Sequence, residues 1–201
     1  MRILGIDPGT NATGYGVVER DGARMHHVAH GVLRPARAQS MAARLAQIYV
    51  GLVELIAEHE PSCVAIEQIF VAASSRSALV LGQARGVALA AIGASGLPFE
   101  EISPQQIKLA VTGSGAAEKL QVQAMVRRLL ALDALPARDA ADALAAAICR
   151  AQLHGALARR AQLGEEAATA TASAARKLWE ESASRPRRRA RAAQFVLRSA
   201  R

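Results

Sequence analysis

RILGIDPG, residues 2–9, is a short apolar run that ends in a carboxylate and a Pro-Gly turn. Apolar runs of this length that are closed by Pro and Gly are typical of buried β-strands. We therefore predict a core strand over residues 2–7, with Asp7 at the point where the strand ends. The rest of the fold can be worked out from this strand.

A β-hairpin is predicted directly after it. Residues 13–20 and 24–34 are both strand-like, and Asp21-Gly22 between them is a strong hairpin signal. The N-terminal part of the chain should therefore form three sequential antiparallel strands.

Helical and strand-like patterns alternate beyond residue 40. The predicted elements are a helix capped by Ser40 that ends before Pro61, a strand at 63–67, a helix from 77 to about 95, a strand at 99–103, a helix after the loop VTGSGAAEK, and a helix from about 138 to 153. This order, β-β-β-α-β-α-β-α-α, predicts an α/β fold in which helices cover a mixed five-stranded sheet.

The positive charge is concentrated in the C-terminal part of the chain. The 201 residues carry 25 Lys and Arg against 17 Asp and Glu, a formal net charge of +8. Residues 1–155 have a net charge of +1, whereas residues 156–201 hold 11 basic and 4 acidic side chains. We expect an α/β domain over residues 1–155 and a flexible or partly helical basic tail, rich in Ala and Arg, over residues 156–201. A basic tail favours an anionic partner.

The sequence predicts a cytoplasmic protein without a membrane segment. It contains no run of about 18 uncharged apolar residues, and Asp7 comes too early for a signal peptide. Cys63 and Cys149 lie in apolar surroundings without CxxC spacing, so we expect buried, reduced thiols.

Four carboxylates occupy positions where acidic side chains are otherwise costly. Asp7 and Glu67 end predicted core strands, and Asp139 and Asp142 stand in the Ala-rich helical segment DAADALAAA. Asp139 and Asp142 are three residues apart and therefore share one helix face near its N-terminus. Alone, that pair would be a helix-capping motif, because the helix dipole favours anions there.

Four carboxylates that face one another need compensating positive charge. Hard divalent cations such as Mg²⁺ provide it through oxygen ligands, and two Mg²⁺ ions would balance four negative charges. Two such ions about 3.5–4 Å apart activate a water and stabilise the leaving oxygen in phosphoryl displacement. The sequence shows neither a Ser-His-Asp arrangement nor a cysteine nucleophile, which argues against acyl transfer. The residues thus favour phosphodiester hydrolysis.

Five motifs resemble those of a known family. They are GIDPGTNATGYGVV, CVAIEQIF, SALVLGQARGVALA, SPQQIKLAVTGSGAAEKLQVQAMV and DAADALAAAICR. In order and spacing they are similar to the RuvC family of crossover junction endodeoxyribonucleases, over about residues 1–153. The resemblance implies an RNase H-like fold, a homodimer, and Mg²⁺-dependent paired nicking of two strands of like polarity at four-way (Holliday) junction DNA, in recombination and DNA repair. It also implies cooperation with the branch-migration proteins RuvA and RuvB.

The resemblance assigns roles to the acidic residues and to two lysines. It implies that two Mg²⁺ ions, with Mn²⁺ as a substitute, are held by four catalytic acids: Asp7, Glu67, Asp139 and Asp142. Lys108 and Lys119 match the functional lysines of the family, where a cation contacts the scissile phosphate or offsets transition-state charge. Without the resemblance, both lysines would be interpreted as solvated side chains.

Three further residues are implicated in DNA binding or dimer formation. Phe70 matches the aromatic residue that stacks on a junction base, although by itself it would be interpreted as a core residue. Arg76 follows it and can meet backbone phosphates. Arg85 lies on the helix that resembles the dimer-forming helix of the family. For either arginine alone, a surface role is the simpler interpretation. We also expect the basic tail to add nonspecific, salt-sensitive DNA affinity.

Three other functions remain as alternatives. GIDPGT also resembles the first phosphate loop of the actin, Hsp70 and sugar-kinase group, but the chain lacks a second matching loop and the length for two lobes. A RuvC-like nuclease that acts on ribosomal RNA precursor shares the Asp at the strand end. A non-catalytic junction-binding protein would use the fold and the tail without cleaving, but it would gain nothing from four carboxylates aimed at phosphates.

Overall fold

A mixed five-stranded sheet forms the centre of the fold. The computed structural model describes residues 1–68 and 75–184. The strands are β1 (Arg2–Asp7), β2 (Thr13–Asp21), β3 (Arg24–Leu33), β4 (Cys63–Glu67) and β5 (Phe99–Ile102). Their order is β3-β2-β1-β4-β5, in which β1, β2 and β3 are antiparallel neighbours while β4 is parallel to both β1 and β5. The predicted fold class is confirmed.

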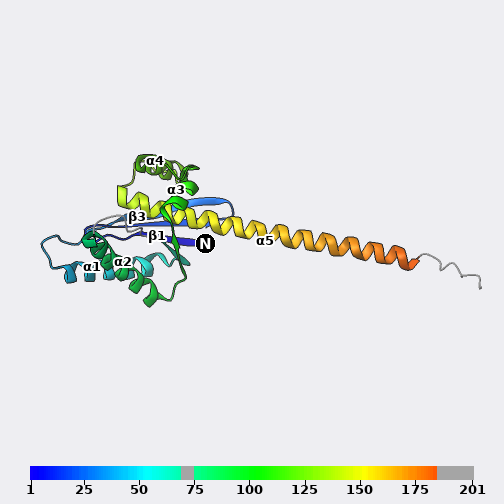
Figure 1. Ribbon diagram of the computed structural model, residues 1–201, viewed down its shortest axis with the longest axis horizontal. Helices are drawn as coiled ribbons and strands as arrows, with labels where there is room; N and C mark the ends of the chain where they lie inside the picture. Colours follow the sequence, from blue (N-terminus) through cyan, green and yellow to red (C-terminus); the bar gives the residue numbers. More distant parts are fainter. Residues whose placement is uncertain (69–74, 185–201) are drawn as a thin grey trace, which may run out of the picture. The chain divides into compact units, whose positions relative to one another are not determined.

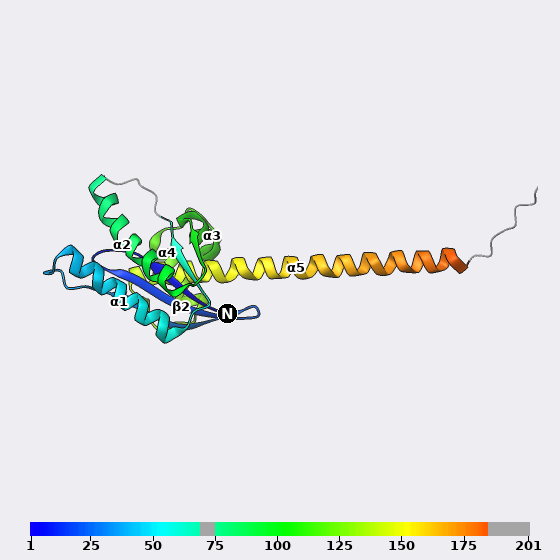
Figure 2. The same ribbon diagram turned by 90° about the horizontal axis from the view of Figure 1, so that it is seen from below.

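Helices cover both faces of this sheet. They are α1 (Met41–His59), α2 (Ser75–Ser95), α3 (Pro104–Thr112), α4 (Lys119–Leu129) and α5 (Arg138–Ser184). Figures 1 and 2 show α1 and α2 on one face, and α3, α4 and the first turns of α5 on the other. Successive β1 residues point to opposite faces, so Ile3 joins the core under α5 while Leu4 joins the core under α1 and α2.

Helix α3 is an element that the sequence analysis did not predict. Ser103 caps it and Pro104 is its first residue; the Ser103 and Gln106 side chains form a reciprocal capping box. Gly113 ends it with a positive φ of 78°. These residues were the available signal, because Ser-Pro with Gln three residues after the Ser is a helix start. The helix has only 9 residues, too few for a clear apolar period.

The last helix is longer than its periodicity predicts. The pattern of apolar residues ends near Leu153, whereas α5 continues to Ser184. Contacts divide the chain into two compact units, Met1–Leu157 and Ala158–Arg201. The second unit is rich in Ala, which has the highest helix propensity of all residues, so the helix continues without an apolar face.

The two cysteines are buried free thiols, as predicted. Cys63 and Cys149 belong to the core between the sheet and α5. Burial raises the pKa of both thiols, that of Cys149 to about 11.

Candidate active site

Two carboxylates meet where adjacent parallel strands end. Asp7 is the last residue of β1 and Glu67 the last of β4. The strands pair in parallel up to Ile6 and Ile66, so the next residue on each strand leaves the sheet at the same edge. This placement follows from the apolar runs that precede each acid.

The start of α5 brings two more carboxylates to the same edge. Gly14 pairs with Asp7 across β1 and β2. A Cβ at Gly14 would overlap the backbone carbonyl of Asp139, so the helix lies directly on the strand there. One turn further, Asp142 faces the same way as Asp139. A glycine opposite Asp7 thus sets how closely the first turn of α5 approaches the strand ends.

The turn after β1 is held by side-chain hydrogen bonds. The Thr13 hydroxyl, which is buried, donates to the Gly9 carbonyl at 2.8 Å and accepts from the Gly9 N–H at 3.3 Å. Arg44 of α1 donates to the Thr10 carbonyl and to the Asn11 side chain. Asp7 is therefore followed by a turn that is anchored to β2 and to α1.

The four carboxylates act on one another electrostatically. Burial, followed by the charges of Asp142, Glu67 and Asp139, raises the pKa of Asp7 to about 7, although the Lys119 ammonium partly offsets them. Burial and Asp142 likewise raise the pKa of Glu67, against the two nearby lysines. A raised pKa means that ionised carboxylates lack sufficient positive charge here.

Both predicted lysines lie beside these acids. Glu67, Lys108, Lys119 and Asp142 line a small pocket of about 50 Å³, together with apolar residues of α3 and α4. The Lys119 ammonium lies 3.4 Å from an Asp142 carboxylate oxygen. Since α3 supplies Lys108 and α4 supplies Lys119, the helix that was not predicted carries one of the two cations.

Arg34 is a third nearby cation, and the sequence analysis did not single it out. Its guanidinium lies 3.8 Å from an Asp139 carboxylate oxygen. The only signal was its position directly after β3, at the end of the sheet where Asp7 lies. The ion pair joins the edge of the sheet to the start of α5.

The side chains present suit a hard divalent cation. All four candidate ligands are carboxylates, the oxygen donors that Mg²⁺ prefers. Within residues 1–68 and 75–184, no three His, Cys, Asp or Glu side chains already form a ready-made metal-ligand group. Instead Asp142 and Asp139 pair with Lys119 and Arg34. The donor set and the raised pKa of Asp7 nevertheless fit a divalent cation.

The structure describes the remaining predicted residues, Phe70, Arg76 and Arg85, to different extents. Phe70 lies outside the described residues, and for Arg76 only its place in the first turn of α2 is described. Arg85 is not a surface arginine. Its side chain is 15% exposed, bonded to the backbone carbonyl of Glu67 and paired with Glu101.

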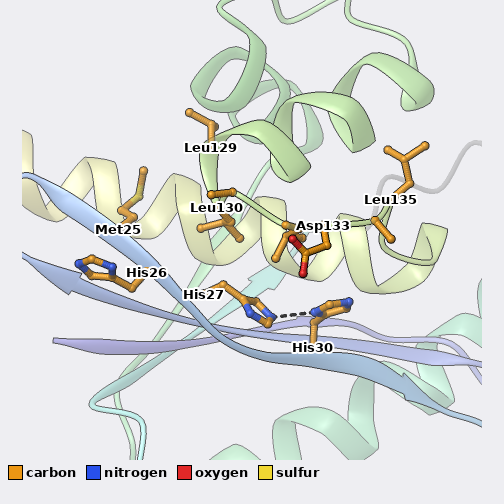
Figure 3. Close-up of a pocket in the computed structure, with 11 residues that line it drawn as sticks. Met25, His26, His27, His30, Leu129, Leu130, Asp133 and Leu135 are labelled. Atoms are coloured by element: carbon orange, nitrogen blue, oxygen red, sulfur yellow. Dashed lines mark hydrogen bonds between the residues drawn. The ribbon is translucent and has the colours of Figure 1, made fainter.

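A second pocket lies away from the carboxylates, between β3 and the segment that follows α4 (Figure 3). It has a volume of about 570 Å³, and His26, His27 and His30 line it together with Asp133. The ring nitrogens of His27 and His30 are 2.7 Å apart. A β-bulge opposite Val17 and Val18 adds one residue between the two histidines, which puts them on one face.

Comparisons with known proteins point to one family. The family model of crossover junction endodeoxyribonuclease RuvC matches residues 3–150. A protein of that name from Halorhodospira halophila is 55% identical over 150 residues, 75% of this chain and 89% of the relative. Another from Cupriavidus metallidurans is 46% identical over 168 residues, 84% of this chain and 93% of the relative. The structure of T. thermophilus RuvC in complex with Holliday junction substrate superposes with a TM-score of 0.73, at 32% identity over 77% of this chain and 95% of that one.

Proposed function

Because this chain belongs to the RuvC family of crossover junction endodeoxyribonucleases and is a Holliday junction resolvase of recombination and repair, we propose that its active site is the carboxylate cluster at the ends of β1 and β4. The observation that supports this site most strongly is the convergence of four carboxylates from three elements: Asp7, Glu67, Asp139 and Asp142. The family consists of metal-dependent nucleases. We propose that these residues hold two Mg²⁺ ions, with Mn²⁺ as a substitute.

The residues around the cluster prepare it for phosphodiester cleavage. Bound divalent cations supply the activation of a water and the stabilisation of the leaving oxygen. Lys108 and Lys119 line the pocket next to Glu67 and Asp142, where an ammonium group attracts the scissile phosphate and offsets the charge of the transition state. The buried turn at Thr13 keeps Asp7 in place, so little reorganisation is needed when the substrate binds. The expected products carry a 5'-phosphate and a 3'-hydroxyl.

DNA contacts beyond the cleavage point rest on the sequence resemblance. We propose that Phe70 stacks on a junction base and that Arg76 meets backbone phosphates. Both residues follow Glu67 in the chain, and Glu67 ends β4 at the edge of the sheet where the carboxylates lie.

The chain acts as a homodimer in this proposal, with α2 as the shared helix. Leu79 on α2 is 68% exposed, and only 22% of the segment Ser77–Ser95 is buried. By length and composition this segment would also pass as a membrane span, but a single such helix is weak evidence. Pairing with a second copy covers the same apolar surface. It also supplies two symmetric sites for a junction with two-fold symmetry.

Partners and location complete the proposal. A cytoplasmic location and cooperation with RuvA and RuvB fit a resolvase that acts on branch-migrated DNA. The excess positive charge of residues 156–201 would add phosphate contacts that carry no sequence specificity.

Cleavage of a labelled mobile four-way junction tests the proposal. The wild type and Asp7→Asn are compared with Mg²⁺ and with EDTA, beside a linear duplex of identical sequence. We expect paired symmetric nicks confined to the junction, dependent on Mg²⁺ and lost in Asp7→Asn. Full activity in Asp7→Asn would refute the assigned site.

Two other outcomes would point to the alternatives. Tight junction binding without cleavage by the wild type would favour the non-catalytic junction-binding protein. Neither binding nor cleavage, with cutting of ribosomal RNA precursor, would favour the RNA-processing nuclease.

A further inference from the structure

Arg85 connects three elements next to the carboxylate cluster. It lies in the middle of α2, and its Nη1 donates a hydrogen bond of 2.8 Å to the backbone carbonyl of Glu67, the last residue of β4. Its Nη2 lies 2.6 Å from a carboxylate oxygen of Glu101 on β5. The two bonds use different nitrogens of one planar guanidinium, which fixes its orientation.

These bonds fix the peptide group that follows the Glu67 side chain. The Glu67 carbonyl and the Gln68 N–H belong to one peptide plane. Arg85 binds the carbonyl, and the Gln68 N–H donates to the Ile102 carbonyl at 2.8 Å. Because both polar ends of this plane are bonded, the last backbone rotation of β4 is restrained. That rotation sets how the backbone carries the Glu67 carboxylate relative to Asp7 on the neighbouring strand.

Arg85 acts on the backbone and not on the substrate pocket. The pocket beside the cluster is lined by Glu67, Lys108, Lys119 and Asp142, but not by Arg85. The Arg85 guanidinium is mostly buried and already has two acceptors. Its position therefore differs from that of the lysines, whose ammonium groups face the space in which a phosphate would bind.

We infer that Arg85 is a positioning residue that sets the direction of the Glu67 carboxylate and makes it depend on the position of α2. This inference rests on the proposed role of Glu67 in the active site. Since α2 is also the proposed dimer helix, pairing of two copies orders the site through the Arg85 guanidinium.

A matched pair of ion-pair variants separates positioning from general stability. Arg150 of α5 pairs with Glu100, the neighbour of Glu101 on β5, at 2.8 Å and 20% side-chain exposure. Arg150→Ala removes a similar, partly buried ion pair from the same strand, but Arg150 makes no hydrogen bond or ion pair with Glu67. Arg85→Ala, Arg85→Lys and Arg150→Ala are compared in the full-length protein.

Three quantities are measured for each variant. They are the single-turnover cleavage rate of a saturated junction with Mg²⁺, the junction dissociation constant with Ca²⁺, and the Mg²⁺ concentration that gives half the maximal rate. Rates are normalised to the protein that binds the junction, so that a misfolded fraction does not count. Thermal unfolding reports stability separately.

We expect Arg85→Ala to lower the cleavage rate by about 10- to 100-fold and to raise the half-maximal Mg²⁺ concentration, as removal of a partner of a metal-holding residue does. The junction dissociation constant should stay within about threefold, because Arg85 does not face the DNA pocket. Arg85→Lys should recover part of the rate, since it keeps the charge but not both directional bonds. Arg150→Ala should lower stability without this change in Mg²⁺ requirement.

Two results would overturn the inference. One is an unchanged rate and Mg²⁺ requirement in Arg85→Ala; the other is equal losses in Arg85→Ala and Arg150→Ala, which would indicate stability alone. Glu67→Gln distinguishes this failure from failure of the proposed site. If Glu67→Gln is inactive, only the role of Arg85 is refuted, whereas an active Glu67→Gln would refute the assigned site itself.

Discussion

The two faces of the sheet are packed in different ways. Under α5 the chain uses Gly and Ala, so that helix and strand backbones touch: a Cβ at Gly5 or Gly14 would overlap a carbonyl of α5. Under α1 and α2 the core contains larger side chains such as Ile48 and Leu52, while Leu79 of α2 is exposed. Close backbone contact fixes the carboxylates of α5, whereas α2 keeps an exposed apolar side chain.

Gly14→Ala should have the largest effect on the close packing of α5 against the sheet. The added methyl group would overlap the Asp139 carbonyl, and the start of α5 would have to move away from β2. We expect a loss of about 1–3 kcal/mol in the free energy of unfolding. We also expect about a 100-fold lower cleavage rate, because Asp139 moves with the helix.

Gly93→Ala on α2 is the control for the Gly-to-Ala change itself. Nothing lies within 4 Å of its added Cβ, so Ala should stabilise the helix by up to about 1 kcal/mol. Denaturant unfolding and junction cleavage of both variants check the contrast. Full activity in Gly14→Ala would contradict the tight fit of α5.

The carboxylates of α5 contribute to the raised pKa of Asp7 at the end of β1, and this effect can be tested through the pH dependence of stability. In metal-free protein the pKa of Asp7 is raised from 3.8 to about 7, so the folded state holds this proton more tightly than the unfolded state. The contribution of Asp7 to stability is therefore complete below about pH 4 and is lost as the pH rises towards 7. Asp7→Asn should be more stable than the wild type at pH 8, on the order of 2 kcal/mol, and the gain should vanish near pH 4.

Urea unfolding in EDTA between pH 4 and pH 8 measures this difference. A stability gap between Asp7→Asn and the wild type that does not change with pH would contradict the raised pKa. Addition of Mg²⁺ at pH 8 should stabilise the wild type more than the variant, because bound cations favour the ionised carboxylate.

The proposed dimer contact through α2 can be tested by placing a charged side chain on its exposed surface. Leu79→Glu should weaken a dimer by on the order of 10-fold or more, since it places a carboxylate in an apolar interface. Leu120→Glu on α4 is a matched control, because Leu120 is 67% exposed and Leu79 is 68% exposed. Sedimentation over a concentration series gives the dimer affinity. Equal effects of the two variants would exclude α2 as the shared helix.

Removal of the second unit should have the smallest effect. A chain that ends at Leu157 keeps the complete first unit, so its cleavage rate at saturation should equal that of the full chain. Its junction affinity should depend less steeply on salt, because fewer phosphates are neutralised. Replacement of Arg187, Arg188 and Arg189 by Gln in the full chain should partly reduce the salt dependence of junction affinity. If the slope of log affinity against log salt concentration is unchanged in both proteins, residues 156–201 do not contact the DNA.

The sheet was predictable because its evidence is local. Apolar runs that end in Asp7 and Glu67 indicate buried strands, and adjacent parallel strands then bring both acids to one edge. The bonds of Arg85 were not predictable, because one of them joins a side chain to a backbone carbonyl 18 residues away. The contact of His27 with His30 was hidden for another reason: residues three apart on a regular strand face opposite ways, and only the bulge reverses this.

The position of the four carboxylates along the chain has a consequence for synthesis. Asp7 leaves the ribosome before Asp139 and Asp142, which follow 132 and 135 residues later, near the end of the first unit. A nascent chain or an early truncation product that lacks α5 therefore holds only half of the acidic set. If these four residues form the active site as proposed, a chain without α5 cannot complete it.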